Sequence, residues 1–319
     1  MLTLADIQAA RERIAPYVLH TPLLHSPALS DLLGMRVSLK YELFQVTESF
    51  KPRGAFNKVL SLSDEQRARG ILAVSGGNHG KAVAHLARRL GLRALVFMPE
   101  TAAPSAIAAV RADGAELRLF PTAAAAFAAA SQLEAEGLTF VHPYADSLVV
   151  AGQGTLGLEI AEQAPDCTDL IASIGGGGMI GGLALALKAL CPTVRVWGVE
   201  PEGADALSQA LAAGSVVPLT AISSLIATLS PPSASELTLA LAQRYIEDIV
   251  LVPDRAAIAD MLVLLDLAHV LAEPAAAITL SAARLLRERL TPDGHLVLVI
   301  CGASITLDEL VAYRVRFGL

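Results

Sequence analysis

Cysteine and positive charge are both scarce in this sequence. The chain has only three cysteines, Cys167, Cys191 and Cys301, which are odd in number and far apart. This pattern excludes a disulfide framework and favours a reducing compartment. Asp and Glu outnumber Lys and Arg by 31 to 24, and the formal net charge is −7. Such a surface has no electrostatic footprint for nucleic acid or an anionic membrane, so we expect small-molecule chemistry.

A long, uninterrupted apolar run is missing as well. Leu170 to Leu187 contains four consecutive glycines, and Ala206 to Ser235 contains three prolines and many hydroxyl groups. Neither stretch makes a convincing membrane-spanning helix. Residues Met1 to Arg13 are amphipathic and charged, without the apolar core of a signal peptide. We therefore expect a cytoplasmic protein that has no membrane partner.

A regular alternation of strand and helix patterns predicts the fold. The 319 residues, 54% of them hydrophobic, suffice for two domains with buried cores. We expect an α/β protein with two parallel-sheet domains, a small one (70–147) inserted into a large one (1–69 and 148–319), and a ligand in the cleft between them. The predicted strands are 35–43, 71–75, 94–98, 117–120, 139–141, 170–174, 194–199, 249–252 and 296–300. The predicted helices lie near 3–14, 51–62, 78–90, 104–112, 122–136, 179–190, 202–213, 235–246, 255–271 and 275–290.

Lys51 stands at the start of a predicted helix, within the segment Ser-Phe-Lys-Pro-Arg-Gly-Ala. Ser49 can cap this helix, and Pro52 suits its first turn. Arg53 and the helix N-terminus are both expected to lower the pKa of the lysine amine and leave a nucleophilic nitrogen. The alternative is an ordinary surface lysine at a helix start.

A glycine-rich turn, Gly175-Gly176-Gly177-Gly178-Met179, follows a predicted strand and opens a helix. Its backbone N–H groups and the helix dipole converge on one point, which predicts a phosphate site. The spacing from Gly176 through Gly178 to Gly181, with Glu200 after the next strand, also fits a dinucleotide fingerprint. Its place in mid-chain and the lysine motif upstream argue against that second interpretation.

Two further segments end predicted strands and carry polar groups. Ser75 to Gly80 reads Ser-Gly-Gly-Asn-His-Gly and opens a helix, so it is a second place for an anion. Asn78 is alternatively an N-cap, and His79 is more readily a structural neighbour than a base. Cys301 begins Cys-Gly-Ala-Ser after the last strand, where an isolated cysteine is commonly a small core residue.

Together these motifs resemble those of the serine/threonine dehydratase-like family of fold type II pyridoxal-phosphate enzymes, which have the tryptophan synthase β-like fold. The resemblance runs from about residue 15 to 305 and implies a homodimer. It implies that Lys51 carries pyridoxal 5'-phosphate, that the glycine turn grips its phosphate, that Asn78 binds the ring hydroxyl oxygen and that Cys301 meets the ring nitrogen. It also implies that the loop after residue 74 holds the substrate carboxylate. The implied cofactor contacts are Phe50, Lys51, Asn78, Gly175, Gly176, Gly177, Gly178, Met179 and Cys301, and the implied substrate contacts are Ser75, Gly76, Gly77, Asn78 and His79.

This sequence departs from the family pattern at several positions. Gly76 stands where the family's racemases have a serine that exchanges a proton on the second face of Cα. The segments Val199-Glu200-Pro201 and Glu273-Pro274-Ala275 resemble family segments, and some members bind a cation through the first. Ala206, at the expected third ligand position, brings no oxygen, so we expect no metal. The regions 144–146 and 223–235 match poorly and leave the substrate's side chain open.

The resemblance implies β-elimination from a 3-hydroxy amino acid such as L-threonine or L-serine, with release of a 2-oxo acid and ammonia. Lys51 would remove the Cα proton, and the cofactor phosphate would protonate the departing hydroxyl. A neutral thiol at Cys301 makes the ring a weaker electron sink, which suits prompt elimination. The alternatives are a racemase or β-replacement enzyme of the same fold, an NAD-dependent oxidoreductase, and a cofactor-binding protein that has lost catalysis.

Overall fold

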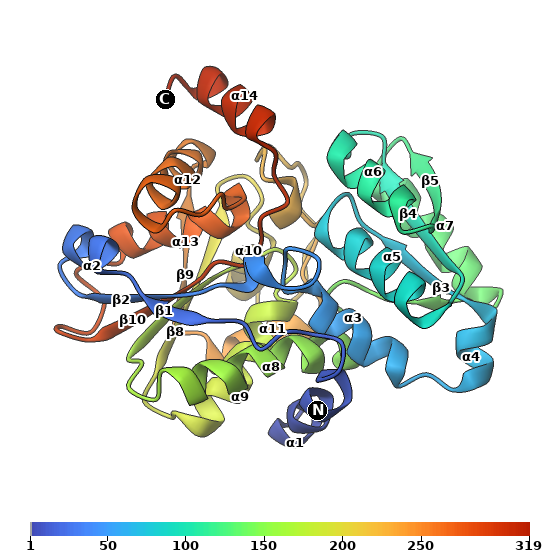
Figure 1. The fold of residues 1–319 in the computed structure, drawn as a ribbon, viewed down its shortest axis with the longest axis horizontal. Coiled ribbons are helices and arrows are strands. Elements are labelled where there is room, and N and C mark those ends of the chain that lie inside the picture. The colour runs from blue at the N-terminus through green and yellow to red at the C-terminus, as the bar shows by residue number, and fades with distance from the viewer. Residues whose placement is uncertain (1) are drawn as a thin grey trace.

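The protein is built on two separate sheets (Figure 1). The structure is a computed structural model and describes residues 2–319. The larger sheet has the order β1-β2-β10-β7-β8-β9. Only β1 runs antiparallel to its neighbour, and the remaining pairs are parallel. Its strands are β1 (Leu23–His25), β2 (Arg36–Lys40), β7 (Asp169–Ser173), β8 (Arg195–Pro201), β9 (Asp248–Val252) and β10 (His295–Val299).

Helices cover both faces of this larger sheet, which explains why β7 and β10 are buried along their whole length. On one side lie α1 (Leu4–Ile14), α8 (Ser147–Gln163), α9 (Gly178–Leu190) and α11 (Glu236–Tyr245) (Figure 1). On the other lie α2 (Pro27–Leu33), α12 (Asp254–Ala268) and α13 (Pro274–Leu285). The helices α8 and α9 approach so closely that a Cβ on Gly182 would lie 2.3 Å from the Val150 carbonyl oxygen, so glycine is required there.

The smaller sheet is parallel throughout and has the order β5-β4-β3-β6. Its strands are β3 (Ile71–Val74), β4 (Ala94–Pro99), β5 (Glu116–Phe120) and β6 (Thr139–Phe140). Helices α5 (Asn78–Leu90) and α6 (Pro104–Ala112) cover one face, and α7 (Ala123–Ala135) covers the other (Figure 1). Ala126 and Ala130 of α7 are fully buried, which confirms that the alanine-rich stretch is a packed helix.

Helix α3 (Lys51–Leu60) joins the two parts of the molecule. Its Ala55, Phe56 and Val59 share a core with Ile71 and Ala73 of β3, while the helix also packs against α8 and α1. The α/β class and the two domains with parallel sheets are therefore as predicted. The domain boundaries at 69/70 and 147/148 stay a prediction.

Several elements differ from the sequence predictions. β1, α2 and α4 (Asp64–Arg69) were not predicted because they are short, and α8 was not predicted because it carries glycine; α14 (Leu307–Phe317) was not predicted either. The predicted strand 35–43 is shorter, since β2 ends at Lys40 and a 3-10 turn follows at Glu42–Phe44. Helix α10 (Ala206–Ala213) begins later than expected, and α12 ends early because His269 adopts a left-handed conformation at φ 56°.

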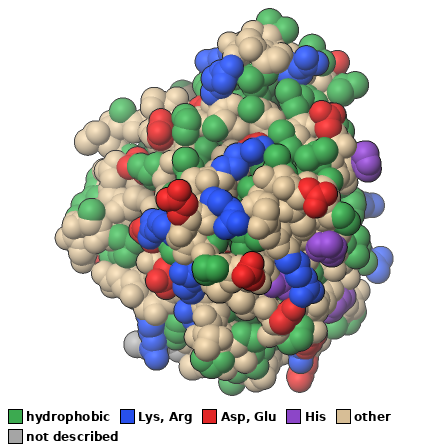
Figure 2. Space-filling model, turned by 90° about the vertical axis from the view of Figure 1, so that its left-hand side faces the viewer, with side chains coloured by type: hydrophobic (Ala, Val, Ile, Leu, Met, Phe, Trp, Pro, Cys, Tyr) green, Lys and Arg blue, Asp and Glu red, His purple; other side chains and the backbone are tan. Residues whose placement is uncertain are grey.

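Charges of both signs are interspersed on the face shown in Figure 2, which is the left-hand side of Figure 1. Within residues 2–319, no helix has both the length and the apolar character that crossing a bilayer requires.

Candidate active site

One cleft brings together all the site residues predicted from the sequence. It has a volume of about 1280 Å³ and lies where β3, β7 and β10 end. The carboxyl ends of parallel strands are the usual ligand-binding edge of such sheets. The predicted residues in its lining are Phe50, Lys51, Ser75, Gly76, Gly77, Asn78, His79, Gly175, Gly176, Gly177, Gly178, Met179 and Cys301.

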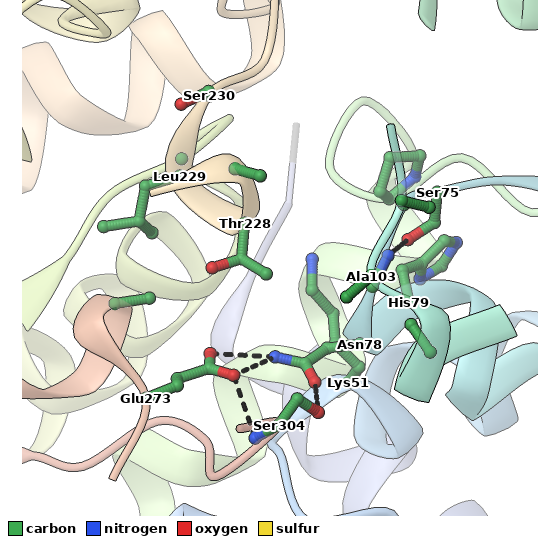
Figure 3. Close-up of a pocket in the computed structure, with 18 of the residues that line it drawn as sticks. Lys51, Ser75, Asn78, His79, Ala103, Thr228, Leu229, Ser230, Glu273 and Ser304 are labelled. Carbon is green, nitrogen blue, oxygen red and sulfur yellow. Dashed lines mark hydrogen bonds between the residues drawn. The ribbon is translucent and has the colours of Figure 1, made fainter. Parts of the chain in front are cut away.

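Lys51 is the first residue of α3, and its side chain extends into the space between Thr228 and Ser75 (Figure 3). Desolvation lowers the pKa of its amine to about 8, against the weaker opposing influence of Cys301 and Glu273. Its nitrogen lies 4.9 Å from the centre of the Phe50 ring. A far larger fraction of this amine is therefore neutral near physiological pH than of an ordinary lysine, which makes it a usable base and nucleophile.

The start of the lysine motif's helix differs from the prediction. Ser49 does not cap α3; Phe50 occupies the N-cap position, and the buried Ser49 hydroxyl has no hydrogen-bond partner among residues 2–319. Instead the backbone fixes the helix start, because Phe50 N–H donates to the Cys301 carbonyl at 3.2 Å and Ser49 forms a bridge with Gly302. The lysine is thus held against the end of β10.

Arg53 does not lower the pKa of Lys51, contrary to the prediction. Its guanidinium is buried in ion pairs with Glu42 at 2.7 Å and Glu159 at 2.6 Å. Glu159 also pairs with the buried Lys40 at 2.6 Å. These ion pairs tie α3 to α8 and to the end of β2, so Arg53 fixes the position of the motif and does not tune the pKa of Lys51.

The glycine turn forms a cup at the N-terminus of α9. Gly177 has φ 85°, a left-handed conformation that other residues rarely adopt, and it is the N-cap of the helix. A Cβ on Gly176 would lie 2.2 Å from the ring of Tyr144, so only glycine fits there. The backbone N–H groups of Gly176 and Gly177 have no acceptor within residues 2–319. Free amides at a helix N-terminus are suited to bind an anion.

The loop after β3 presents Asn78 to the cleft. Asn78 is the first residue of α5 and does not act as its N-cap, a position that Gly77 occupies. The Asn78 amide nitrogen instead donates to both carboxylate oxygens of Glu273, at 2.9 and 3.0 Å, and its carbonyl oxygen accepts from the Ser304 hydroxyl (Figure 3). In the same loop, Gly77 N–H donates to the Ser75 hydroxyl at 3.1 Å.

Glu273 is the most prominent polar residue that we assigned no role from the sequence. It is buried beside Lys51 and Asn78, and desolvation raises the pKa of its carboxyl to about 7. Hydrogen bonds from Asn78 and from Ser304 N–H, the latter at 3.0 Å, oppose this rise. The sequence signal was weak, because a glutamate before a proline at a helix start is ordinarily explained by its favourable interaction with the helix N-terminus.

Cys301 contributes a neutral thiol at the end of β10. Burial raises its pKa to about 12, so it carries no charge at neutral pH. The thiol lies 3.5 Å from the Ser173 hydroxyl and donates to the Ala275 carbonyl at 3.5 Å. Ser173, the last residue of β7, also lines the cleft but was not among the predicted site residues.

His79 anchors the cleft wall. Its Nε2 lies 2.7 Å from the Val141 carbonyl oxygen and must donate to it, because a carbonyl can only accept. Burial is the main reason that its pKa falls to about 3, and that of His142 falls to about 4 for the same reason. A pKa of about 3 makes the His79 imidazole a weak base at neutral pH, which favours a structural position for His79 over that of a base.

Glu200 is absent from the residues that line the cleft. Its carboxylate accepts from Leu207 N–H and Ser208 N–H, each at 2.9 Å, and from the Ser208 hydroxyl at 2.6 Å. The carboxylate that would have to bind a dinucleotide ribose is therefore already hydrogen-bonded to the start of α10. Within residues 2–319 no group of three or more His, Cys, Asp or Glu side chains is arranged to hold a metal ion. That no metal binds stays a prediction.

Comparison with known proteins identifies the family. Residues 14–302 match the family described as pyridoxal-phosphate dependent enzyme. A phenylserine dehydratase from Ralstonia pickettii is 38% identical over 284 residues, which cover 88% of this chain and 87% of the relative. A solved threonine deaminase from T.th. matches with a TM-score of 0.89 and 39% identity over 96% of this chain and 99% of that one. Maize serine racemase matches with a TM-score of 0.91 and 30% identity, over 99% and 97%.

The family match spans almost the whole region in which the four motifs occur, and the fold agrees with it. The chain therefore belongs to the pyridoxal-phosphate dependent enzymes of fold type II.

Proposed function

We propose that this protein catalyses the elimination of water from 3-hydroxy amino acids, with release of a 2-oxo acid and ammonia. The observation that carries the proposal is the desolvated amine of Lys51, which shares one cleft with the glycine cup and the Asn78 loop. Relatives named phenylserine dehydratase and threonine deaminase support the same reaction class.

The residues of the cleft fit pyridoxal phosphate. The free amides of the cup suit its phosphate, and a Cβ at Gly176 or Gly178 would meet Tyr144 at 2.2 or 3.0 Å, so this cradle requires glycine. Lys51 would hold the aldehyde end, Asn78 the ring oxygen, and Cys301 the ring nitrogen, with Phe50 and Met179 beside them. When bound, the cofactor attaches the substrate amino group covalently and draws electrons away from Cα.

The chain's own residues would then remove the Cα proton and allow the β-hydroxyl to depart. Lys51, released by the incoming amino acid, is the base for the Cα proton, because its pKa of about 8 lies near physiological pH. Ser75 and the backbone amides of Gly76 and Gly77 would hold the substrate carboxylate. The uncharged thiol of Cys301 provides no fixed negative charge at its end of the cleft, which favours prompt loss of the β-hydroxyl.

The lining of the cleft favours an uncharged substrate side chain. Among residues 2–319, the lining contains no arginine, and its lysine other than Lys51 is Lys81, which is paired with Glu48 at 2.7 Å. Burial lowers the pKa of both lining histidines, His79 and His85, below the ordinary value, so neither imidazole offers a positive charge at neutral pH. A second carboxylate on the substrate would find no free cation, whereas methyl or phenyl groups would meet walls such as Pro99 and Leu229.

An ammonia-release screen tests the proposal. The purified enzyme with pyridoxal phosphate is assayed with L-serine, L-threonine, L-threo-3-phenylserine and L-threo-3-hydroxyaspartate, and both ammonia and the 2-oxo acid are measured. We expect turnover of at least one of the first three and little of the last. Absence of ammonia from all four, despite bound cofactor, would favour a binding protein without catalysis. Turnover that requires an added nucleophile would indicate β-replacement.

Racemisation is the second candidate, because the chain is similar to maize serine racemase. Gly76 argues against it, since glycine offers no group to exchange a proton on the second face of Cα. A Cβ there would meet Pro99 at 3.3 and 3.5 Å and Ala102 at 3.8 Å, so a serine side chain fits after small adjustments.

We predict that Gly76→Ser gains measurable formation of D-serine from L-serine, which chiral chromatography detects. Gly76→Ala is the matched control, because it adds similar bulk without a hydroxyl and should form none. Equal D-serine from both variants, or none from Gly76→Ser in a cofactor-loaded enzyme, would contradict our interpretation of this position.

The lowered pKa of Lys51 predicts a pH dependence of cofactor loading. Only the neutral amine reacts, and the folded pKa of about 8 lies below the ordinary 10.5, so the neutral fraction rises as pH passes through 8 and then levels off. The initial rate of reconstitution of the cofactor-free enzyme should increase about tenfold from pH 7 to 9. An amine of ordinary pKa would give about a hundredfold increase without levelling. Stopped-flow absorbance distinguishes the two.

We also propose that the enzyme acts as a cytoplasmic homodimer with the small domain at 70–147. Its three cysteines are free thiols, which suits a reducing compartment. Large apolar side chains such as Leu24, Leu32 and Phe44 are exposed, as at an interface between subunits.

A further inference from the structure

A chain of hydrogen bonds crosses the cleft from its rim to its floor. At the rim, the Lys81 ammonium donates to Glu48 at 2.7 Å and to the Ser304 hydroxyl at 3.1 Å. The Ser304 hydroxyl donates in turn to the Asn78 side-chain carbonyl, and the Asn78 amide nitrogen donates to Glu273 (Figure 3). Lys81 and Asn78 lie on α5 next to the smaller sheet, whereas Ser304 and Glu273 follow elements of the larger one.

The groups at the two ends, the Lys81 ammonium and the Glu273 carboxylate, together set the direction of every bond in this chain. An ammonium group can only donate, so the Ser304 hydroxyl must accept from it. The single hydroxyl hydrogen is then free to point at Asn78, whose amide oxygen accepts it. The NH2 end of Asn78 is consequently turned toward Glu273, whose backbone-anchored carboxylate also accepts from Ser304 N–H at 3.0 Å.

Burial makes this direction important at the inner end. Asn78 and Glu273 are 5% and 2% exposed, so water cannot replace a lost partner there. In a flipped amide, the Asn78 oxygen would face the Glu273 carboxylate, and its NH2 group would face the Ser304 hydroxyl, which already accepts from Lys81. Gly302 leaves room for the pair, since a Cβ at that position would lie 2.9 Å from the Glu273 carboxylate. The Glu273 carboxylate favours this orientation of Asn78 at the inner end, and a donor at the outer end reinforces it through Ser304.

The pair with Glu48 does not explain Lys81 by itself. The side chain of Glu48 is 63% exposed, and an ion pair with such an exposed partner contributes little to stability. The Lys81 side chain is only 15% exposed, because it turns inward to Ser304.

We propose that Lys81 is a positioning residue, which acts through Ser304 to hold the Asn78 amide with its NH2 group toward Glu273 and the cleft. The inference rests on the proposed role of Asn78 in binding the cofactor and goes beyond it. Only a side chain that is an obligate donor does this. Arginine should therefore replace Lys81, whereas methionine should not, and glutamate should reverse the chain by accepting the Ser304 hydrogen.

The test measures the Kd of cofactor-free enzyme for pyridoxal phosphate, with the melting temperature as a folding check. We expect Lys81→Met to raise the Kd about tenfold, as loss of the charged, partly buried hydrogen bond from Lys81 to Ser304 would do, and Lys81→Glu to raise it further. Lys81→Arg and the surface control Glu48→Gln should remain within about twofold of the unchanged protein. The same order should appear in kcat with the best hydroxy amino acid, with little change in KM.

A double-mutant cycle with Ser304→Ala separates positioning from general damage. If Lys81 acts through Ser304, Lys81→Met should add nothing to the effect of Ser304→Ala on the Kd. Additive effects, a Lys81→Arg variant as weak as Lys81→Met, or a Lys81→Met variant equal to Glu48→Gln would each overturn the inference. Because the Kd needs no turnover, these outcomes are distinct from failure of the ammonia assay, which bears on the proposed reaction alone.

Discussion

Replacement of Lys51 by alanine is expected to abolish both turnover and the visible absorption of lysine-bound pyridoxal phosphate. No other lysine amine among residues 2–319 combines a place in the cleft with freedom from ion pairing, since Lys81 is held by Glu48 and Ser304. We expect kcat to fall at least about a thousandfold, because loss of a base and of the covalent anchor act together. Absorbance spectra and ammonia release measure the two effects.

The folded state should survive this change. Burial disfavours the charged form of the Lys51 amine, as its pKa of about 8 indicates, so alanine removes a desolvation cost along with the side chain. The cofactor-free variant should melt no lower than the cofactor-free original protein. Lys58→Ala is the matched control, because Lys58 lies on the same helix but pairs with Asp146 at 2.6 Å outside this cleft. Persistence of the visible band in Lys51→Ala, or its loss in Lys58→Ala, would contradict the assignment.

The predictable features of this protein are those that the local sequence determines. The apolar runs that became β3, β4, β7 and β10 are continuous because both faces of each sheet are covered. The glycine turn and the lysine motif each follow the end of an element, where backbone geometry dictates the residue type. Four such segments therefore pointed to one cleft before any packing was known.

Other features were hidden because contacts distant in sequence determine them. Helix α8 contains Gly152, Gly154 and Gly157, which lower helix propensity. They are needed because a Cβ on Gly152 would lie 2.4 Å from the Arg53 carbonyl oxygen, and one on Gly157 would lie 2.4 Å from that of Leu183. The local pattern thus opposed a helix that tertiary packing requires.

The same limitation applied to the polar part of the site. Arg53 looked like a neighbour of Lys51, but residues two positions apart on a helix point in different directions, and its partners Glu42 and Glu159 could not be inferred from spacing. Glu273 and Ser304 reach Asn78 from 195 and 226 residues away, so no sequence window contains them together.

Gly176→Ala is expected to weaken cofactor binding strongly, because the new methyl group would clash with Tyr144 rather than with the cofactor itself. The added Cβ would lie 2.2 Å from two ring atoms of Tyr144, which is 8% exposed and packed edge-on against His142 with ring centres 4.7 Å apart. Either the tyrosine or the glycine cup must move. Overpacking of this kind costs roughly 1–3 kcal/mol, so we expect the Kd for pyridoxal phosphate to rise about tenfold to a hundredfold.

Tyr144→Ala in the same chain should restore much of the lost affinity, because it removes the atoms that the new methyl group meets. The Kd values of the two single variants and the double variant, measured by titration of cofactor-free enzyme, form a cycle whose coupling should be large and favourable. Additive losses would mean that Gly176 matters for the path of its own backbone instead. The cup would then owe its shape to the turn alone, and the contact with Tyr144 would be a consequence of that shape rather than its cause.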